Sequence, residues 1–219
     1  MNFPSSQTEH FFHQTKQPAV VRSQFARPLG WLGRLAGKLM ATANRSINHL
    51  VIDLLHIRPD DQLLEIGFGP GQGIQLAASW ASRGFVAGVD VSEVMIQQAT
   101  KRNRRFIEQG RVALQQGSVS ALPFSDRRFS KVFAVNSVQF WPQLEDDLRE
   151  VCRVLQENGL LLLCVRQHDP TARWRPAPGF SKSDLDKVQI TMRRAGFRDV
   201  RRMTRRAGRE LVAVITGRR

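Results

Sequence analysis

The sequence has little cysteine, no long apolar run and few acidic residues. Its 219 residues include only two cysteines, Cys152 and Cys164, so we expect neither a disulfide framework nor a metal site. No apolar stretch approaches the roughly 18 residues that a membrane-spanning helix needs. The first residues also lack the basic start and apolar core of a secretory signal. We therefore expect a cytoplasmic protein with an ordinary core and no transmembrane segment.

Acidic residues are outnumbered by basic ones. The chain has 33 lysines and arginines against 19 aspartates and glutamates, which gives a formal net charge of +14. The excess is concentrated between Arg193 and Arg219, where ten arginines face only Asp199 and Glu210. Such a cluster is typical of a surface that binds RNA or another anionic partner. It is also typical of the solvated face of edge strands, where charge opposes edge-to-edge association, and composition leaves both interpretations open.

What the sequence does contain is an apolar run that leads into Gly67, Gly69 and Gly71. Glycine has no Cβ and tolerates positive φ, so a strand that ends in such a loop brings its backbone close to a ligand. The helix expected next would point its first N–H groups at the same place. A dinucleotide fingerprint is absent, because positions 72 and 74 are Gln72 and Ile74, and no lysine follows as in a phosphate loop. The alternative is a tight turn without a ligand.

Strands and helices are expected to alternate along the rest of the chain. The expected strands cover residues 63–66, 85–89, 112–115, 131–136, 160–165, 197–204 and 210–216. The expected helices cover residues 72–82, 93–106, 143–155 and 181–195, with Asn158–Gly159 as the stop signal of the third. This alternation predicts a parallel, doubly wound α/β sheet whose last two strands are antiparallel, because the link between them is short.

Two parts of the chain are expected. Apolar residues at helical spacing over 31–56 predict one or two helices. We expect residues 1–57 to form an N-terminal arm and lid helices, and residues 58–219 to form the main domain.

Asp90 is the second feature that points to a nucleotide. It ends the expected strand 85–89 and lies 23 residues after Gly67, near the distance at which an acid reaches ribose hydroxyls in βαβ nucleotide folds. Both hydroxyls can donate to its two oxygens. The alternative is a helix-capping aspartate, although Ser92 already suits that cap. Met95, one turn further on, would lie beside a base or pack in the core.

Four segments together resemble the class I S-adenosylmethionine-dependent methyltransferases. They are the LLEIGFGPG run of 63–71, the GVDVS run of 88–92, the GSVSALPF run of 117–124 and the strand with its end at 129–137. The family often has aspartate where this chain has Ser118 and Ser130. The resemblance implies a seven-stranded Rossmann-like sheet in three α/β/α layers with the last strand antiparallel. It also implies S-adenosyl-L-methionine as cofactor and S-adenosyl-L-homocysteine as product.

The resemblance also implies roles for individual residues. Glu65 would hold the amino end of the methionine moiety, Asp90 the ribose, and Ser118 the adenine. The expected cofactor-binding residues are Glu65, Gly67, Phe68, Gly69, Gly71, Asp90, Val91, Met95, Ser118, Val119 and Asn136. Asn44, Phe140 and Trp141 are expected in the substrate pocket, and Asn136 and His168 are the candidates for catalysis. Orientation of the acceptor in line with the methyl group would supply much of the rate.

The acceptor is predicted to be a small molecule, with two alternatives. The basic C-terminal region suggests an RNA methyltransferase, although Asn136 is followed by Ser137 and Val138 rather than the two prolines used on exocyclic base amines. The serines at 118 and 130 suggest a non-catalytic protein that binds the cofactor without turnover.

Overall fold

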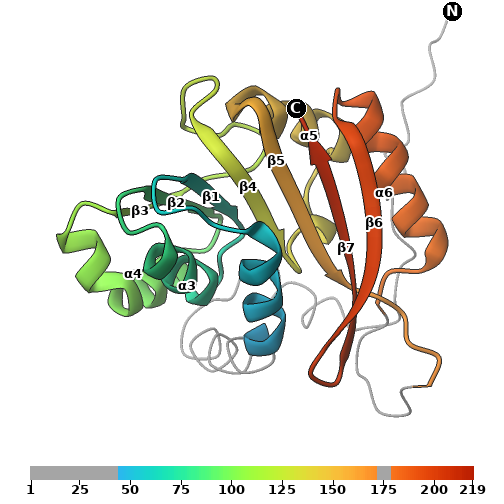
Figure 1. Ribbon diagram of the computed structural model, residues 1–219, viewed down its shortest axis with the longest axis horizontal. Helices are drawn as coiled ribbons and strands as arrows, with labels where there is room; N and C mark the ends of the chain where they lie inside the picture. Colours follow the sequence, from blue (N-terminus) through green and yellow to red (C-terminus); the bar gives the residue numbers. More distant parts are fainter. Residues whose placement is uncertain (1–43, 172–178) are drawn as a thin grey trace, which may run out of the picture.

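A computed structural model describes residues 44–171 and 179–219, and a seven-stranded sheet runs through its centre (Figure 1). The strands are β1 (Gln62–Ile66), β2 (Phe85–Asp90), β3 (Val112–Gln116), β4 (Phe129–Val135), β5 (Leu155–Arg166), β6 (Arg198–Ala207) and β7 (Glu210–Arg218). The helices are α3 (Gln72–Trp80), α4 (Glu93–Glu108), the short η1 (Val138–Phe140), α5 (Leu144–Val154) and α6 (Lys182–Arg194). Residues 44–55 are also helical, as expected, whereas residues 1–43 of the expected arm and lid helices at 1–57 lie outside the described residues.

The order of the strands confirms the predicted topology. The sheet has the order β3-β2-β1-β4-β5-β7-β6. Strands β1 to β5 are parallel, and β7 lies antiparallel between β5 and β6. The chain moves outward from β1 to β3 and then returns to the other side of β1. Ligands bind where the strand order reverses, outside the carboxyl ends of the strands, so the carboxyl edge near β1 and β4 is where a site is expected.

Helices cover both faces of the sheet and give three layers. One face packs against α3, α4 and the helix at 44–55, through side chains such as Ile74, Ala99 and Val51. The other packs against α5 and α6, through side chains such as Leu148 and Val188. Because both faces are covered, a central strand must be apolar on both sides. This explains the unbroken apolar run of residues 160–165 in β5.

Capping residues fix where several helices begin. Ser92 precedes α4, and its hydroxyl accepts from the N–H of Met95 at 3.4 Å. Ser181 and Asp184 form a capping box at α6, because each side chain accepts the other's main-chain N–H. The sequence placed Ser92 before a helix, and this position is confirmed, whereas Ser181 was expected as the first residue of its helix and is its capping residue instead.

The predicted role of Asn158–Gly159 was wrong. Helix α5 ends at Val154, and β5 begins at the next residue, so the pair lies inside the strand. The pairing of β4 with β5 shifts register there, because Phe129 pairs with Leu155 whereas Lys131 pairs with Leu160. Asn158 has a φ of 60°. The pair therefore forms a bulge, and bulges, like helix ends, favour residues that tolerate the left-handed region.

Ser130 lies at the amino-terminal end of β4, at the far edge of the sheet from the carboxyl ends. Its hydroxyl donates to Asp61 Oδ1 at 2.8 Å, and Lys131 forms an ion pair with the same buried carboxylate. Burial raises the pKa of Asp61, but the hydrogen bonds from Lys131, Arg58 and Ser130 outweigh it, so the pKa lies below its ordinary value. Ser130, which stands where the family often has aspartate, thus supports a structural ion pair that joins β4 to the turn before β1.

Candidate active site at the carboxyl edge of the sheet

A cavity of about 220 Å³ opens at the carboxyl ends of β1, β2, β3 and β4. Its lining comes from the loops after these strands, from the start of α4 and from the helix at 44–55. The lining residues are Asn44, Asn48, Glu65, Ile66, Gly67, Phe68, Gly69, Pro70, Gln72, Val89, Asp90, Val91, Met95, Gly117, Ser118, Val119, Val135, Asn136, Ser137, Phe140, Trp141 and Pro142. Five separate segments of the chain therefore meet at the edge where the topology places a ligand.

The glycine loop brings its backbone to the floor of this cavity. Gly69 has a φ of 53°, and a Cβ added there would meet no atom of the described residues within 4 Å. A side chain at this position would therefore extend into open space beside the lining. Gly71 differs: an added Cβ would lie 2.5 Å from the Cβ of Ala99 in α4, and Gly71 does not line the cavity. The third glycine thus permits helix packing, whereas the second keeps the cavity open.

Asp90 ends β2 and fixes the glycine loop. One carboxylate oxygen accepts from the main-chain N–H of Gly69 at 2.8 Å, and the other accepts from the N–H of Ser92 at 2.9 Å. Burial raises the pKa of Asp90, although the hydrogen bonds from Ser92, Gly69 and Val91 oppose that rise. The two oxygens together offer about four lone-pair sites, so the carboxylate retains capacity to accept from a ligand.

Glu65 brings a carboxyl group beneath the first turn of α3. Its side chain is 2% exposed, and a Cβ added to Gly73 would lie 2.5 Å from either oxygen. Burial is the larger cause that raises the pKa of Glu65 well above its ordinary value, and repulsion from Asp90 raises it further. The hydrogen bond from the N–H of Ile74 only partly offsets this rise. Within the described residues, Oε2 of Glu65 has no hydrogen-bond partner. A buried acceptor without a partner is costly, and this one lines the cavity.

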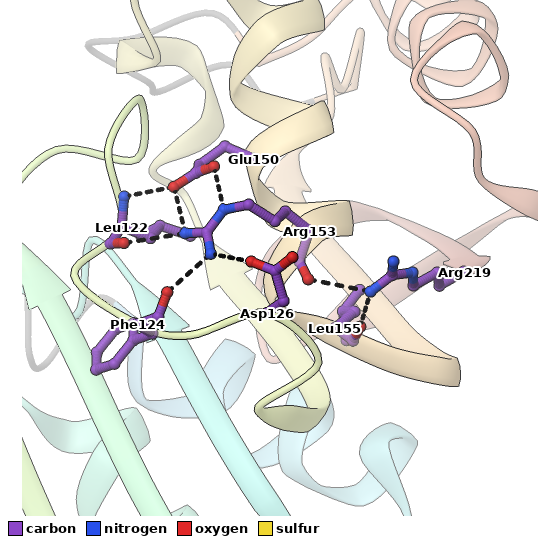
Figure 2. A network of polar contacts seen from close by, with 7 residues as sticks. All are labelled: Leu122, Phe124, Asp126, Glu150, Arg153, Leu155 and Arg219. Atoms are coloured by element: carbon purple, nitrogen blue, oxygen red, sulfur yellow. Dashed lines mark hydrogen bonds and ion pairs between the residues drawn. The ribbon is translucent and has the colours of Figure 1, made fainter.

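The loop between β3 and β4 carries Ser118 and Val119 to the cavity. Side chains of α5 hold this loop through hydrogen bonds to its main chain. Figure 2 shows Arg153 of α5 donating to the carbonyls of Leu122 and Phe124, at 3.1 and 2.8 Å, and pairing with Asp126 at 2.7 Å. Glu150 accepts from the N–H of Leu122 at 2.8 Å. The hydrogen bond from Arg153 lowers the pKa of Glu150, although burial opposes this. One arginine thus fixes the path of the loop on the side away from the cavity.

The far end of the cavity is built around Asn136, directly after β4. Its Oδ1 accepts from the main-chain N–H of Arg166 at 3.0 Å, and its Nδ2 donates to Asn44 Oδ1 at 3.0 Å. The guanidinium of Arg166 donates to the same Asn44 oxygen at 2.9 Å and pairs with Glu210 at 3.2 Å. Because Arg166 only donates, the orientation of both amides is determined. The helix at 44–55 is thereby joined to the ends of β4, β5 and β7.

Phe140 and Trp141 form an apolar wall at this end. Phe140 is 45% exposed, whereas Trp141 is buried. Within the described part of the chain, the indole N–H of Trp141 has no hydrogen-bond partner. His168 lies beyond β5, is exposed and does not line the cavity. The structure therefore places Asn136 at the cavity and the other catalytic candidate outside it.

Most residues predicted from the sequence meet in this one cavity. Ten of the eleven expected cofactor-binding residues line it, the exception being Gly71, and so do Asn44, Phe140 and Trp141. Sequence reasoning missed Asn48 and Gln72, whose side chains share a 3.3 Å hydrogen bond, as well as Ser137 and Pro142. Asn48 lies four residues after Asn44, so helical periodicity would have placed it on the same face.

Comparison with known proteins bears on the family. Residues 64–163 match the family described as a methyltransferase domain. The uncharacterized methyltransferase YdaC of Bacillus subtilis (strain 168) is 29% identical over 166 residues, which are 76% of this chain and 87% of YdaC. A crystal structure of a SAM dependent methyltransferase from Aquifex aeolicus has a TM-score of 0.69 at 16% identity, and the match covers 83% of this chain and 95% of that chain. Together these similarities support a class I S-adenosylmethionine-dependent methyltransferase.

A third similarity concerns an enzyme with a stated acceptor. The 24-methylenesterol C-methyltransferase 2 of Oryza sativa subsp. japonica is 32% identical over 126 residues, which are 58% of this chain and 34% of that enzyme. This methyltransferase thus spans about a third of the length of the sterol enzyme.

The arginines near the C-terminus mostly contact the methyltransferase itself. Arg202 pairs with Asp186 at 2.7 Å and Arg206 with Asp169 at 3.5 Å. Others donate to main-chain carbonyls, which holds for Arg193, Arg198, Arg218 and Arg219. Because β6 is the edge strand, these contacts fit the solvated-edge interpretation, and the structure does not support RNA binding.

Neither a metal centre nor a membrane span is found in the part of the methyltransferase that the structure describes. Over 44–171 and 179–219, no three His, Cys, Asp or Glu side chains are grouped as a metal ion would require. Among the same residues, no helix has both the length and the apolar character to cross a membrane.

Proposed function

We propose that the cavity binds S-adenosyl-L-methionine and that the enzyme transfers its methyl group to a small-molecule acceptor. The observation that carries this proposal is the unpartnered Oε2 of Glu65, buried in the same cavity as Asp90 and the open space at Gly69. A buried carboxylate in that position suits an ammonium group, and Asp90 suits a pair of ribose hydroxyls. The residues present therefore fit an amino acid joined to a nucleoside.

The proposed role of each residue follows from its position in the cavity. Glu65 would hold the amino group, Asp90 the ribose, and Val91, Met95 and Val119 the faces of the base. When bound, the cofactor supplies an electrophilic methyl group. The protein's contribution is to orient the acceptor against it and to exclude water.

The acceptor would enter at the end formed by Asn136, Asn44, Phe140 and Trp141. Phe140, at 45% exposure, makes the mouth of the cavity apolar at this end, which favours an acceptor with an apolar body. The similarity to a sterol C-methyltransferase supports the same class. The fixed amides of Asn136 and Asn44 would position a polar group of such an acceptor.

The test is isothermal titration with S-adenosylmethionine and S-adenosylhomocysteine, with Gly69→Ala as the variant. Among the residues that the structure describes, the added methyl meets no atom, but it extends beside the lining. We therefore expect binding to weaken at least about tenfold. Gly110→Ala is the matched control, because Gly110 also has a positive φ, at 69°, and open space around its Cβ position. It shares the backbone strain but lies between α4 and β3, outside the cavity lining.

Three outcomes are informative. Micromolar binding by the wild type that Gly69→Ala weakens and Gly110→Ala leaves alone supports the proposal. No binding by folded wild-type protein overturns it. Tight binding without methylation of any acceptor in a panel of hydroxyl, amine and alkene compounds favours a non-catalytic cofactor-binding protein.

A further inference from the structure

A chain of hydroxyl groups connects the cavity to a carboxylate that is buried outside it. Ser118 lines the cavity, and its hydroxyl lies 3.2 Å from the hydroxyl of Ser120. Ser120 in turn donates to Oδ1 of Asp147 at 2.7 Å. Asp147 is fully buried in the first turn of α5, and its second oxygen accepts from the N–H of Gln143 at 2.9 Å. Nothing in the proposed mechanism uses Ser120 or Asp147.

The chemistry of the three groups determines the direction of the protons. A carboxylate only accepts, and a serine hydroxyl has one proton and two lone pairs. Ser120 must therefore give its proton to Asp147, so Ser118 gives its own to Ser120. One lone pair of Ser118 accepts from the N–H of Ser120 at 3.2 Å. A single lone pair remains, and Ser118 is thus an acceptor toward the cavity.

The next residue supplies the opposite polarity. Val119 lines the cavity, and within the described residues its main-chain N–H forms no hydrogen bond. The loop thus offers an acceptor and then a donor. Adenine has the complementary pair on its Watson–Crick edge, with an amino group at C6 and an acceptor at N1. Hypoxanthine has the inverse pair, a carbonyl at C6 and an N–H at N1.

We propose that Asp147, acting through Ser120, fixes the proton of Ser118 and thereby makes the site selective for a 6-amino purine over a 6-oxo purine. Ser120 and Asp147 are positioning residues, since neither lines the cavity. The relay would provide the acceptor that an aspartate at 118 would provide directly. This inference rests on the proposed binding of an adenosyl cofactor, and the experiment below separates the two.

The experiment compares two probes, S-adenosylhomocysteine and its inosine analogue, S-inosylhomocysteine, by isothermal titration. For the wild type we expect the adenosyl compound to bind at least about thirtyfold more tightly, because the inosine analogue leaves two polar pairs mismatched. In Ser120→Ala the hydroxyl of Ser118 is free to rotate and donate to a carbonyl. We expect the ratio of the two affinities to fall below about fivefold.

Asp147→Asn should reverse the relay. The N–H of Gln143 requires an acceptor, so the amide oxygen stays there and the amide nitrogen faces Ser120. Ser120 then donates to Ser118, whose proton points into the cavity. Each probe then makes one matched and one mismatched polar pair, so the affinity ratio should fall to about one. Ser118→Asp in the Ser120→Ala background should restore the ratio, because a carboxylate at 118 needs no relay.

Ser79→Ala is the matched control, since Ser79 is an exposed serine in α3 whose hydroxyl donates to a main-chain carbonyl. Ser79→Ala should leave the affinity ratio at the wild-type value. If Ser120→Ala and Asp147→Asn also leave the ratio unchanged, the proposed relay is overturned. Wild-type protein that binds neither probe overturns the proposed function instead. Circular dichroism of each variant shows whether α5 keeps its fold.

Discussion

The two ends of the cavity are built in different ways. At the end proposed for the nucleoside, the contacts join residues close in sequence, such as Gly69 and Asp90, 21 positions apart. At the end proposed for the acceptor, Asn44 meets Arg166 across 122 positions. The first end consists of strand ends and their own loops, and the second exists only where distant segments meet. A cofactor site can therefore be recognised from a short stretch of sequence, whereas an acceptor site cannot.

The largest effect is expected from Asp90→Ala. The substitution removes the acceptor of the Gly69 and Ser92 N–H groups as well as the proposed ribose contacts. We expect the affinity for S-adenosylhomocysteine to fall at least about a hundredfold, because several charge-assisted hydrogen bonds are lost together. Isothermal titration measures this, with the exposed Asp53→Ala as control. An affinity within threefold of the wild type would contradict the assignment of the nucleoside end.

The next effect concerns the loop behind the nucleoside end. Arg153→Met keeps the aliphatic stem but removes the contacts to Leu122, Phe124 and Asp126 shown in Figure 2. We expect the free energy of unfolding to fall by about 2 kcal/mol, because two main-chain carbonyls and a partly buried pair lose their donor. Urea denaturation measures it.

Arg149→Met is the control for Arg153→Met, because Arg149 lies on the same helix and pairs with Glu145 and Asp146 at the surface. Such exposed pairs contribute less than about 1 kcal/mol. Equal destabilisation by the two variants would show that the loop does not depend on Arg153.

A smaller effect is a proton released on binding. Burial and repulsion from Asp90 raise the pKa of Glu65 in the ligand-free protein, with the N–H of Ile74 opposing. An ammonium group placed beside Glu65 favours its charged form, so the proton leaves. We expect release of up to about one proton per cofactor at a pH below the raised pKa. Titration in two buffers of different ionisation enthalpy measures it.

Glu65→Gln is the matched variant, because it keeps the shape and removes the ionisation. Binding to this variant should be weaker and without proton release. The same raised pKa makes the ligand-free wild type lose stability as the pH rises from the ordinary carboxyl range through the folded pKa, since the folded state then holds a proton that the unfolded chain has released. If the Glu65→Gln variant still released a proton on binding, the proton would come from another group.

The smallest effect is expected at the other end of the cavity. Arg166→Met removes the donor to Asn44 and the pair with Glu210, but it touches no residue proposed to hold the nucleoside. We expect the affinity for S-adenosylhomocysteine to change less than about threefold, as for distant sites with no shared partners. Isothermal titration of this variant beside Asp90→Ala checks it. A loss as large as that of Asp90→Ala would show that the two ends are not separate.

The sequence predicted most of the fold because the signals that begin and end its helices and strands are local. Serine caps, glycine loops and apolar runs each act within a few residues, which is why the seven strands were predicted correctly. The short link before β7 likewise predicted that β7 runs antiparallel to β6. Asn158–Gly159 was misread because its conformation suits both a helix end and a bulge, and only the partner strand β4 distinguishes them. The nearby ends of β1, β2 and β3 likewise brought Glu65, Asp90 and Ser118 to one cavity.

The remaining features depend on contacts between residues far apart in the sequence, which no short sequence motif reveals. The relay from Ser118 to Asp147 joins a loop to a helix that follows 27 residues later. The link from Asn44 to Arg166 needs the whole sheet in place. His168 follows β5 as a base would, yet it is exposed and does not line the cavity, because sequence position gives the strand end but not the path of the residues after it.

The position of β7 between β5 and β6 has a consequence for synthesis. Strand β6 joins the sheet only through β7, so a nascent chain that has reached residue 209 has a five-stranded sheet and an unattached β6. The open edge would be β5, whose residues Leu160–Val165 are almost entirely apolar, and such an edge invites pairing with another chain. A ribosome that stalls before Glu210 would therefore expose an aggregation-prone strand, and the last nine-residue strand is what closes it.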